Sequence, residues 1–299
     1  MWFKNLLVYS IPEDYKIDKQ TLEEKLPTQK FSPAMSTQQI SIGWAPVREG
    51  SDELCAGIAA KHYILNFRKE KKLLPPKVIA EFVKERVKKI EENEGRKPGR
   101  KEMRDIKEDV THELMSKAFA IKDDTHVWMD MENHRIIINS GSQSAADAII
   151  TTLIATLDGL SVAPINTEMS PAAAMTMWLT EDDDPPAGFT IDQEAELAAK
   201  DESRANVKFA RKSPEAEEVK KHVSQGMQCV KLAMTWDSKV SFVLTEKLEF
   251  KRIKPVDIKQ EGASDASEDV FESDMALMTS EISAMLNDAL PYFGQQALS

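Results

Sequence analysis

The stretch PPKVIAEFVKERVKKI, residues 75–90, marks the point where the chain changes from a strand pattern to a helical one. Its apolar residues Ile79, Val83 and Val87 recur every four residues, as they do along one face of an α-helix. The turn sequence GRKPG follows at 95–99, and Met103, Ile106, Val110 and Leu114 then begin a second amphipathic pattern. The spacing therefore predicts a helical hairpin over residues 76–119.

Basic residues are expected on the sides of this hairpin that face away from its apolar residues. Lys77, Lys84 and Lys88 fall opposite the apolar face of the first helix when residues are spaced at 100°. The second helix is flanked by Lys97, Arg100, Lys101, Arg104 and Lys107. The sequence thus predicts a basic hairpin with its charge concentrated near the turn.

On both sides of the hairpin the pattern predicts strands mixed with helices. Strands are expected at 2–11, 63–67, 126–131, 135–139, 230–236, 239–244 and 248–253. Short helices are expected after a cap at Asp18 or Thr21, after a cap at Ser142 or Ser144, and from Pro171 to Leu179. The chain closes on an acidic helix with Phe271, Met275, Met278, Ile282 and Met285 at helical spacing. Because no regular βαβ repeat occurs, the fold class expected is α+β, with mixed antiparallel sheets and a protruding basic helical hairpin.

The domain organisation expected from these elements has three parts. Residues 1–75 and 120–180 form a first α/β core, residues 76–119 the hairpin tip, and residues 187–299 a second α+β part with the C-terminal helix. The acidic run 181–184 with Pro185 and Pro186 reads as a solvated linker. A chain of 299 residues with 41% hydrophobic content is long enough for more than one packed unit.

Several compartments and chemistries are disfavoured. The apolar runs are too short to cross a bilayer and Lys4 interrupts a signal-peptide pattern, so the protein is expected in the cytoplasm without a membrane partner. Cys55 and Cys229 are far apart, which argues against a disulfide framework and a thiolate metal site. His112 and Glu113 begin like a zinc-protease helix, but Ser116 stands where the second histidine belongs. We expect no catalytic residue, no metal, no cofactor and no enzyme activity.

The charge distribution keeps a polyanionic ligand open despite a net charge of −11. Residues 68–107 carry +7 and residues 204–259 carry +6, whereas 108–180, 181–203 and 260–299 carry −7, −8 and −8. A partner feels local charge within a Debye length of about 8–10 Å rather than the net charge. Solvated faces of charged helices are the alternative explanation. No base-reading motif occurs, so any DNA binding is expected to be independent of sequence.

Blocks of sequence along nearly the whole chain resemble the RdgC family of recombination-associated proteins. They are WFKNLLVYS at 2–10, GWAPV at 43–47, RKEKKLLPPKVI at 68–79, KAF at 117–119, WMD at 128–130, EEVKKHV at 217–223, VKLAMTW at 230–236 and FESDMALMTSEISAML at 271–286. The resemblance implies a nucleoid-associated protein that forms a ring-shaped homodimer, binds single- and double-stranded DNA without sequence specificity and restrains recombination driven by RecA. Basic side chains would then face the hole of the ring and acidic ones its outside.

The resemblance also implies roles for particular residues. Phe119 corresponds to an aromatic residue that closes the ring between subunits, as suits a two-fold contact, and the alternative is that it fills its own core. Arg211 and Lys212 stand where the family has a basic loop directed at DNA, and Lys117 precedes Phe119 as a phosphate contact. The seven hairpin cations are added from their helical faces and not from the resemblance. The DNA-contacting residues expected are Lys77, Lys84, Lys88, Lys97, Arg100, Lys101, Arg104, Lys117, Arg211 and Lys212.

Two other functions remain as alternatives. The first is a protein-interaction module that acts through its acidic surfaces and C-terminal helix with little direct DNA contact. The second, a nuclease, is disfavoured because the sequence shows no set of metal-binding carboxylates.

Overall fold

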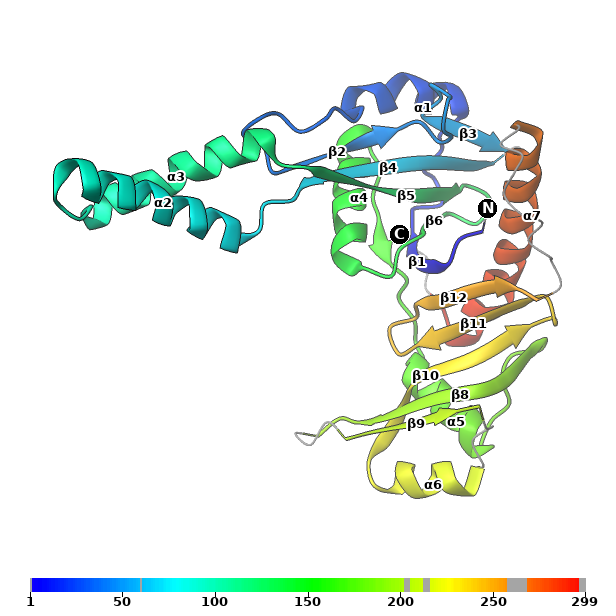
Figure 1. Ribbon diagram of the computed structural model, residues 1–299. Coiled ribbons are helices and arrows are strands. Elements are labelled where there is room, and N and C mark those ends of the chain that lie inside the picture. Colours follow the sequence, from blue (N-terminus) through cyan, green and yellow to red (C-terminus); the bar gives the residue numbers. More distant parts are fainter. Residues whose placement is uncertain (1, 60, 202–204, 212–215, 257–267, 296–299) are drawn as a thin grey trace.

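The computed structural model describes residues 2–59, 61–201, 205–211, 216–256 and 268–295 (Figure 1). Within these residues, twelve strands pair antiparallel, ten of them in the order β2-β4-β5-β6-β1-β12-β11-β10-β8-β9. β3 pairs with β4, and β7 pairs with β1. The expected α+β class, with antiparallel strands and helices in mixed order, is confirmed.

The strands divide into an upper group and a lower group that meet at β1. The upper group is β1 (Asn5–Ser10), β2 (Ile40–Ala45), β3 (Cys55–Ile58), β4 (His62–Lys72), β5 (Ala120–Asp130), β6 (Arg135–Ile138) and β7 (Ala163–Pro164). The lower group is β8 (Phe189–Ala199), β9 (Asn206–Ala210), β10 (Met227–Trp236), β11 (Val240–Thr245) and β12 (Phe250–Pro255). The helices are α1 (Lys19–Lys25), α2 (Pro76–Glu94), α3 (Arg100–Lys117), α4 (Gln143–Thr156), α5 (Pro171–Thr180), α6 (Ala216–Ser224) and α7 (Glu268–Ala289), with short 3-10 turns at Leu26–Gln29 and Leu290–Phe293.

Strand β1 belongs to both groups. Its first residues pair with β12, Asn5 opposite Lys251 and Leu6 opposite Phe250. Its remaining residues pair with β6, Leu7 opposite Ile138. This strand is apolar and almost wholly buried, because helices cover both of its faces.

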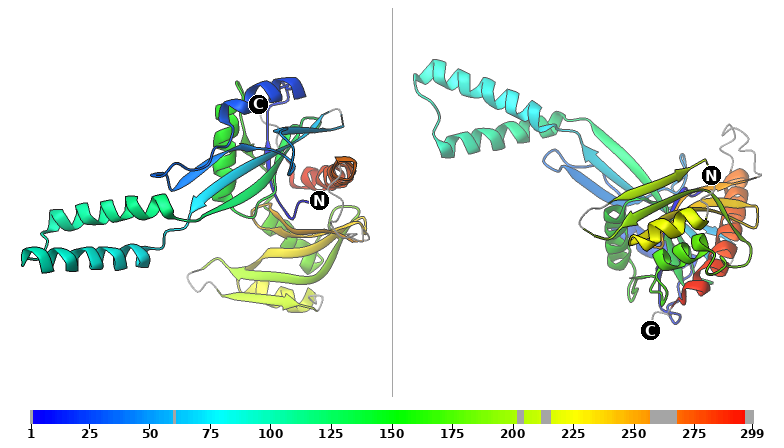
Figure 2. Two further views of the ribbon diagram at one scale, coloured as in Figure 1. Left: turned by 45° about the horizontal axis from the view of Figure 1, so that its top comes forward. Right: turned by 90° about the horizontal axis from the view of Figure 1, so that it is seen from below.

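Helix α7 braces the two groups of strands. Its residues Met278 and Ile282 belong to one core that also contains Ile64 of β4 and Phe250 of β12. Polar contacts follow the same division, since Ser283 bonds to Asp130 in the upper group and Asp288 accepts from Trp236 in the lower one. Helix α4 packs on the opposite face of the upper strands and α5 on the lower ones (Figures 1 and 2).

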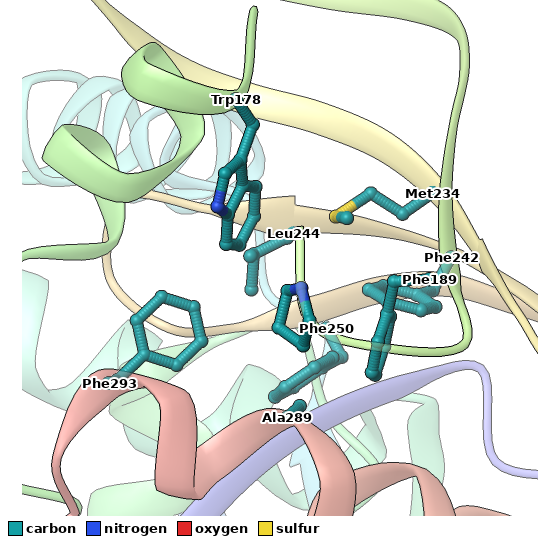
Figure 3. Close-up of a pocket in the computed structure, with 9 residues that line it drawn as sticks. Trp178, Phe189, Met234, Phe242, Leu244, Phe250, Ala289 and Phe293 are labelled. Carbon is teal, nitrogen blue, oxygen red and sulfur yellow. The ribbon is translucent and has the colours of Figure 1, made fainter. Parts of the chain in front are cut away.

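The lower core contains one small gap between aromatic side chains (Figure 3). Trp178, Phe242, Phe250 and Phe293 surround it, together with Met234 and four other lining residues. Its volume of about 10 Å³ holds about one water molecule, so it is a packing gap too small for a ligand.

Helices α2 and α3 form the expected hairpin and project from the ends of β4 and β5 (Figure 1). Pro76 occupies the first turn of α2, and Gly95 ends that helix in the left-handed conformation at φ 66°. Val83, Ile106 and Val110 form a small core between the two helices, separate from the main ones. The hairpin is therefore held to the body through its two connecting strands.

Several local expectations need revision. β4 continues to Lys72 instead of ending near Phe67, because charged residues of the strand alternate between a buried and an exposed face. β2, β3, β8, β9 and α6 were not predicted as elements. The run 181–184 is exposed, as expected of a solvated segment, and two of its carboxylates are tied: Asp182 accepts from Thr180 at 2.6 Å and Asp183 accepts from Tyr292 at 2.5 Å.

Candidate nucleic-acid interface

The root of the hairpin is a ribbon of β2, β4 and β5, and Phe119 lies at its outer end. β4 and β5 pair as far as Lys72 and Ala120, and the Leu73 amide then donates to the Phe119 carbonyl at 2.7 Å. The Phe119 side chain is 85% exposed. It does not fill its own core, so that alternative is wrong. The ribbon instead fixes the backbone that carries the exposed ring.

Four further apolar side chains share the face of the ribbon on which Phe119 lies. Ile40 of β2 and Ile121 of β5 stand on either side of Lys71, and Leu73 stands opposite Phe119. With Ile42 they are between 42% and 48% exposed. We call Ile40, Ile42, Leu73, Phe119 and Ile121 the root face. It is the outer continuation of the face that α4 covers nearer the body, where Trp44 and Phe67 are buried.

The other face of the ribbon is held by polar contacts. Arg68 donates to both carboxylate oxygens of Asp124 directly across the strands, each at 2.6 Å. These hydrogen bonds hold the pKa of Asp124 below its ordinary value. Glu70 and Lys72 are buried and bond to the loop that covers this face, at Ala34 and Met35. The root face is thus presented by a rigid support.

The predicted cations of the hairpin are all exposed, and most lie on one side of it. Arg86 of α2 and Glu113 of α3 form a 2.9 Å ion pair that marks the opposite side. Five cations lie about 140–180° around their helices from that pair at 100° per residue. We call these the cation row: Lys77, Lys84, Lys88, Arg100 and Arg104.

Other candidates fall outside the cation row. Lys97 lies in the turn, and Lys101 and Lys107 lie on the two flanks of α3, each about 120° from Glu113. Lys117 pairs with Glu113 at 3.2 Å, so it lies with the Arg86 pair. Arg211 is exposed at the end of β9 with φ at 59°, and Lys212 lies outside the described residues.

The hairpin as a whole is nearly balanced in charge. Residues 76–119 contain 12 Lys and Arg against 10 Asp and Glu. Lys88 pairs with Glu92 at 3.7 Å and Arg104 with Glu108 at 3.9 Å. Lys77, Lys84 and Arg100 make no ion pair with any residue that the structure describes. Any attraction of the hairpin for a polyanion therefore depends on the separation of charge between its sides.

A second group of charges lies on the lower strands. Lys208 and Arg252 belong to the basic segment 204–259 noted in the sequence, but the carboxylates that pair with them were not identified there. Glu194 of β8 accepts from Arg252 of β12 at 2.9 Å and approaches Lys208 of β9 at 3.7 Å. Glu196 accepts from Lys231 of β10 at 2.8 Å. We call these five residues the sheet cluster. The sequence signal was the alternation of Glu194 and Glu196, which places both on one face of a strand.

Arg252 holds its position at a backbone cost. Its φ of 55° is left-handed, at a place where the pairing of β11 and β12 shifts register. Such a conformation costs a non-glycine residue on the order of 1–3 kcal/mol, whereas an exposed ion pair returns about 0.2–1 kcal/mol. The hydrogen bond from Arg252 also keeps the pKa of Glu194 below its ordinary value.

Groups suited to covalent or metal chemistry do not gather in the described part of the chain. Burial raises the pKa of the thiols of Cys55 and Cys229 to about 12. No three His, Cys, Asp or Glu side chains come together as a possible metal site among the described residues. Among these same residues, no helix is both long and apolar enough to span a membrane.

Comparison with known proteins places the chain in a family. A family model described as "Putative exonuclease, RdgC" matches residues 1–296. Relatives named recombination-associated protein RdgC include one from Bordetella pertussis, 42% identical over 297 residues that cover 98% of each chain. Others come from Janthinobacterium sp. (strain Marseille), 40% identical with 98% of each chain covered, and Ralstonia nicotianae, 39% identical with 98% and 96% covered. The chain therefore belongs to the RdgC family of recombination-associated proteins.

Proposed function

We propose that this protein binds single- and double-stranded DNA without sequence specificity as a ring-shaped homodimer and restrains recombination driven by RecA. The observation that carries the proposal is the match to recombination-associated proteins over the whole chain. The cation row adds physical support, because point charges along a helical hairpin suit phosphates and carry no information about base sequence. Such a protein acts in the cytoplasm, on the nucleoid.

Ring closure is assigned to the root face. Phe119 is a large apolar side chain exposed on a rigid ribbon, and an exposed aromatic ring is stabilised when a second copy removes it from water. In a two-fold contact each copy presents the same surface to the other. The hairpins and lower strands of the two copies then bound the hole that holds the DNA.

The test of DNA binding is a mobility-shift titration with unrelated duplexes and single strands at several salt concentrations. We expect equal affinity for unrelated sequences. The logarithm of the binding constant should fall linearly with the logarithm of the salt concentration, with a slope of about −0.9 for each duplex phosphate that the protein neutralises. If the protein fails to bind duplex even at low salt, DNA binding is wrong and the protein-interaction alternative is favoured.

The test of the ring compares a closed circular DNA with a short linear duplex of the same sequence. A ring slides off a free end but stays on a circle, so we expect the circular complex to survive a high-salt challenge longer. Equal loss from both would indicate an open clamp. Adding RecA to the same circles checks whether occupied DNA resists strand exchange.

The family description also names an exonuclease, which makes nuclease activity the second candidate. Our proposal is non-enzymatic, so end-labelled linear duplex incubated with the protein and Mg²⁺ or Mn²⁺ should keep its length. Release of labelled nucleotides that scales with protein concentration across purified fractions would overturn the non-enzymatic part of the proposal.

A further inference from the structure

The sheet cluster joins strands that are not neighbours. Arg252 lies on β12 and Glu194 on β8, and β11 and β10 lie between them in the sheet. In the sheet, Val243 of β11 pairs with Ala233 of β10 on one side and with Lys251 of β12 on the other. These small side chains leave room for the guanidinium to extend across the sheet surface to the carboxylate.

The cluster contains more cations than carboxylates. Arg252, Lys208 and Lys231 come from three different strands and meet Glu194 and Glu196 on β8. The three cationic side chains remain about half exposed, between 49% and 58%, whereas the carboxylates are 34% and 19% exposed. The carboxylates therefore lie beneath cations that still face solvent.

The cluster occupies the open side of the lower strands, near the junction with β1. The Arg252 amide donates to the Asn5 side chain at 3.3 Å, which places it where the two groups of strands meet. Helices α5 and α6 lie on the other side of β8 and β9, and the hairpin projects past the open side (Figure 2, right). Apolar side chains of the same strands, among them Leu197 and Phe209, are buried toward the helices.

We propose that the sheet cluster is a phosphate-binding surface for DNA, in which Glu194 and Glu196 hold the three cations in place in the free protein and yield them to phosphates on binding. The unusual backbone of Arg252 supports this, because its ion pair alone returns less than the conformation costs. A phosphate takes a guanidinium in the same two-oxygen geometry as a carboxylate. The proposal rests on the DNA binding proposed above and adds where the contact is made and what competes with it.

The experiment compares three variants of the full-length protein in the duplex titration at several salt concentrations. Glu194→Gln removes the competing charge with the same shape, and we expect duplex affinity to rise about threefold at low salt. Arg252→Asn removes the cation while tolerating a left-handed φ, and should lower affinity with a salt slope reduced by about 0.9. The double variant should bind close to Arg252→Asn, with only the smaller gain that acts through Lys208, because Arg252 is the nearer partner of Glu194 at 2.9 Å against 3.7 Å for Lys208.

The control is Glu281→Gln on helix α7, outside the cluster. This change removes the carboxylate that pairs with Lys239. It changes net charge equally and should leave affinity within about 1.5-fold of the unmodified protein. If Glu194→Gln behaves like this control, or if Arg252→Asn keeps full affinity and slope, the sheet cluster is not a phosphate site. Loss of the proposed function itself would appear differently, as an unmodified protein that does not bind duplex. Thermal melting of each variant identifies any that fail to fold.

Discussion

Phe119 is the residue on which ring closure depends. Because its side chain is exposed in the subunit, Phe119→Ser should change the free energy of unfolding by no more than about 0.5 kcal/mol. The same change removes apolar area from the contact between copies, so we expect the dimer to dissociate at concentrations where the unmodified protein stays paired. Urea denaturation measures the free energy of unfolding, and sedimentation equilibrium measures the dissociation of the dimer.

The matched control for this change is Leu277→Ser, which alters an exposed apolar residue on α7, the helix that packs on the opposite face of the upper strands. It should leave the dimer intact. A Phe119→Ser protein that remains fully dimeric would place the subunit contact elsewhere.

Asp124 gives the ribbon a pH-dependent contribution to stability. Its pKa is lower in the folded protein than its ordinary value because Arg68 donates to the ionised carboxylate. The stabilisation is therefore present above about pH 4, the ordinary pKa of an aspartate, and is lost as the pH falls through the lower folded value. Asp124→Asn should cost about 0.5–1 kcal/mol at pH 7 and less at pH 2–3, where more of the carboxylate is protonated. Urea denaturation at the two pH values checks this, and an equal difference at both would contradict it.

At the scale of single residues, local chemistry was predictable and long-range placement was not. Asp18 and Ser142 cap their helices as expected from their side chains, each accepting from a backbone amide three residues later. The role of Arg252 could not be predicted, because its partner Glu194 is 58 positions away and its φ depends on a register shift between two strands. No neighbouring residue signals that shift.

Among the elements, the hairpin is the one whose charge can be tested as a unit. Replacing Lys77, Lys84 and Lys88 by Gln removes three of the five cations of the cation row without touching the apolar face. We expect the salt slope for duplex binding to fall by as much as about 2.7, with lower affinity on every sequence tested.

The control replaces cations of the same helix outside the row, Arg86 and Lys89, by Gln. The triple variant removes three charges and the double variant two, so only a difference in salt slope per charge removed reports on the side of the hairpin. Equal losses would mean that the hairpin acts through total charge or does not face the DNA.

The elements that the sequence predicted are those with a strong apolar period. The hairpin helices, α4 and the strands β1, β10 and β11 all have one. β8 does not, because its sequence FTIDQEAELAA is rich in Ala and Glu and its pairing with β10 shifts register twice. Its strand conformation comes from packing between β10 and β9, which is a tertiary effect that overrides local propensity.

For the whole molecule, α7 is the brace that makes two groups of strands unfold together. Ile282 is fully buried in the core shared by both, so Ile282→Ala should cost about 2–5 kcal/mol. Hydrogen exchange should accelerate by similar factors in β4–β5 and in β10–β11. The exposed Leu277 of the same helix provides the control Leu277→Ala, which should change neither. Acceleration confined to one group would show that the two groups are independent units.

The α+β class followed from the order of elements, but the joining of the strands through β1 did not. A pattern of buried residues such as NLLVYS indicates a strand covered on both faces and leaves its neighbours unspecified. Its neighbours prove to be residues near 138 and near 250, which only the folded chain brings together. The root face has the same origin, since Ile40 and Ile121 become neighbours only through β4.

The position of β1 has a consequence for biosynthesis. β1 leaves the ribosome before β12 and cannot complete its pairing until β12, some 245 residues later, has also emerged. At about 5–20 residues per second, this apolar segment waits on the order of tens of seconds with part of its edge uncovered. Nascent chains of this protein should therefore depend on ribosome-associated chaperones until β12 has emerged.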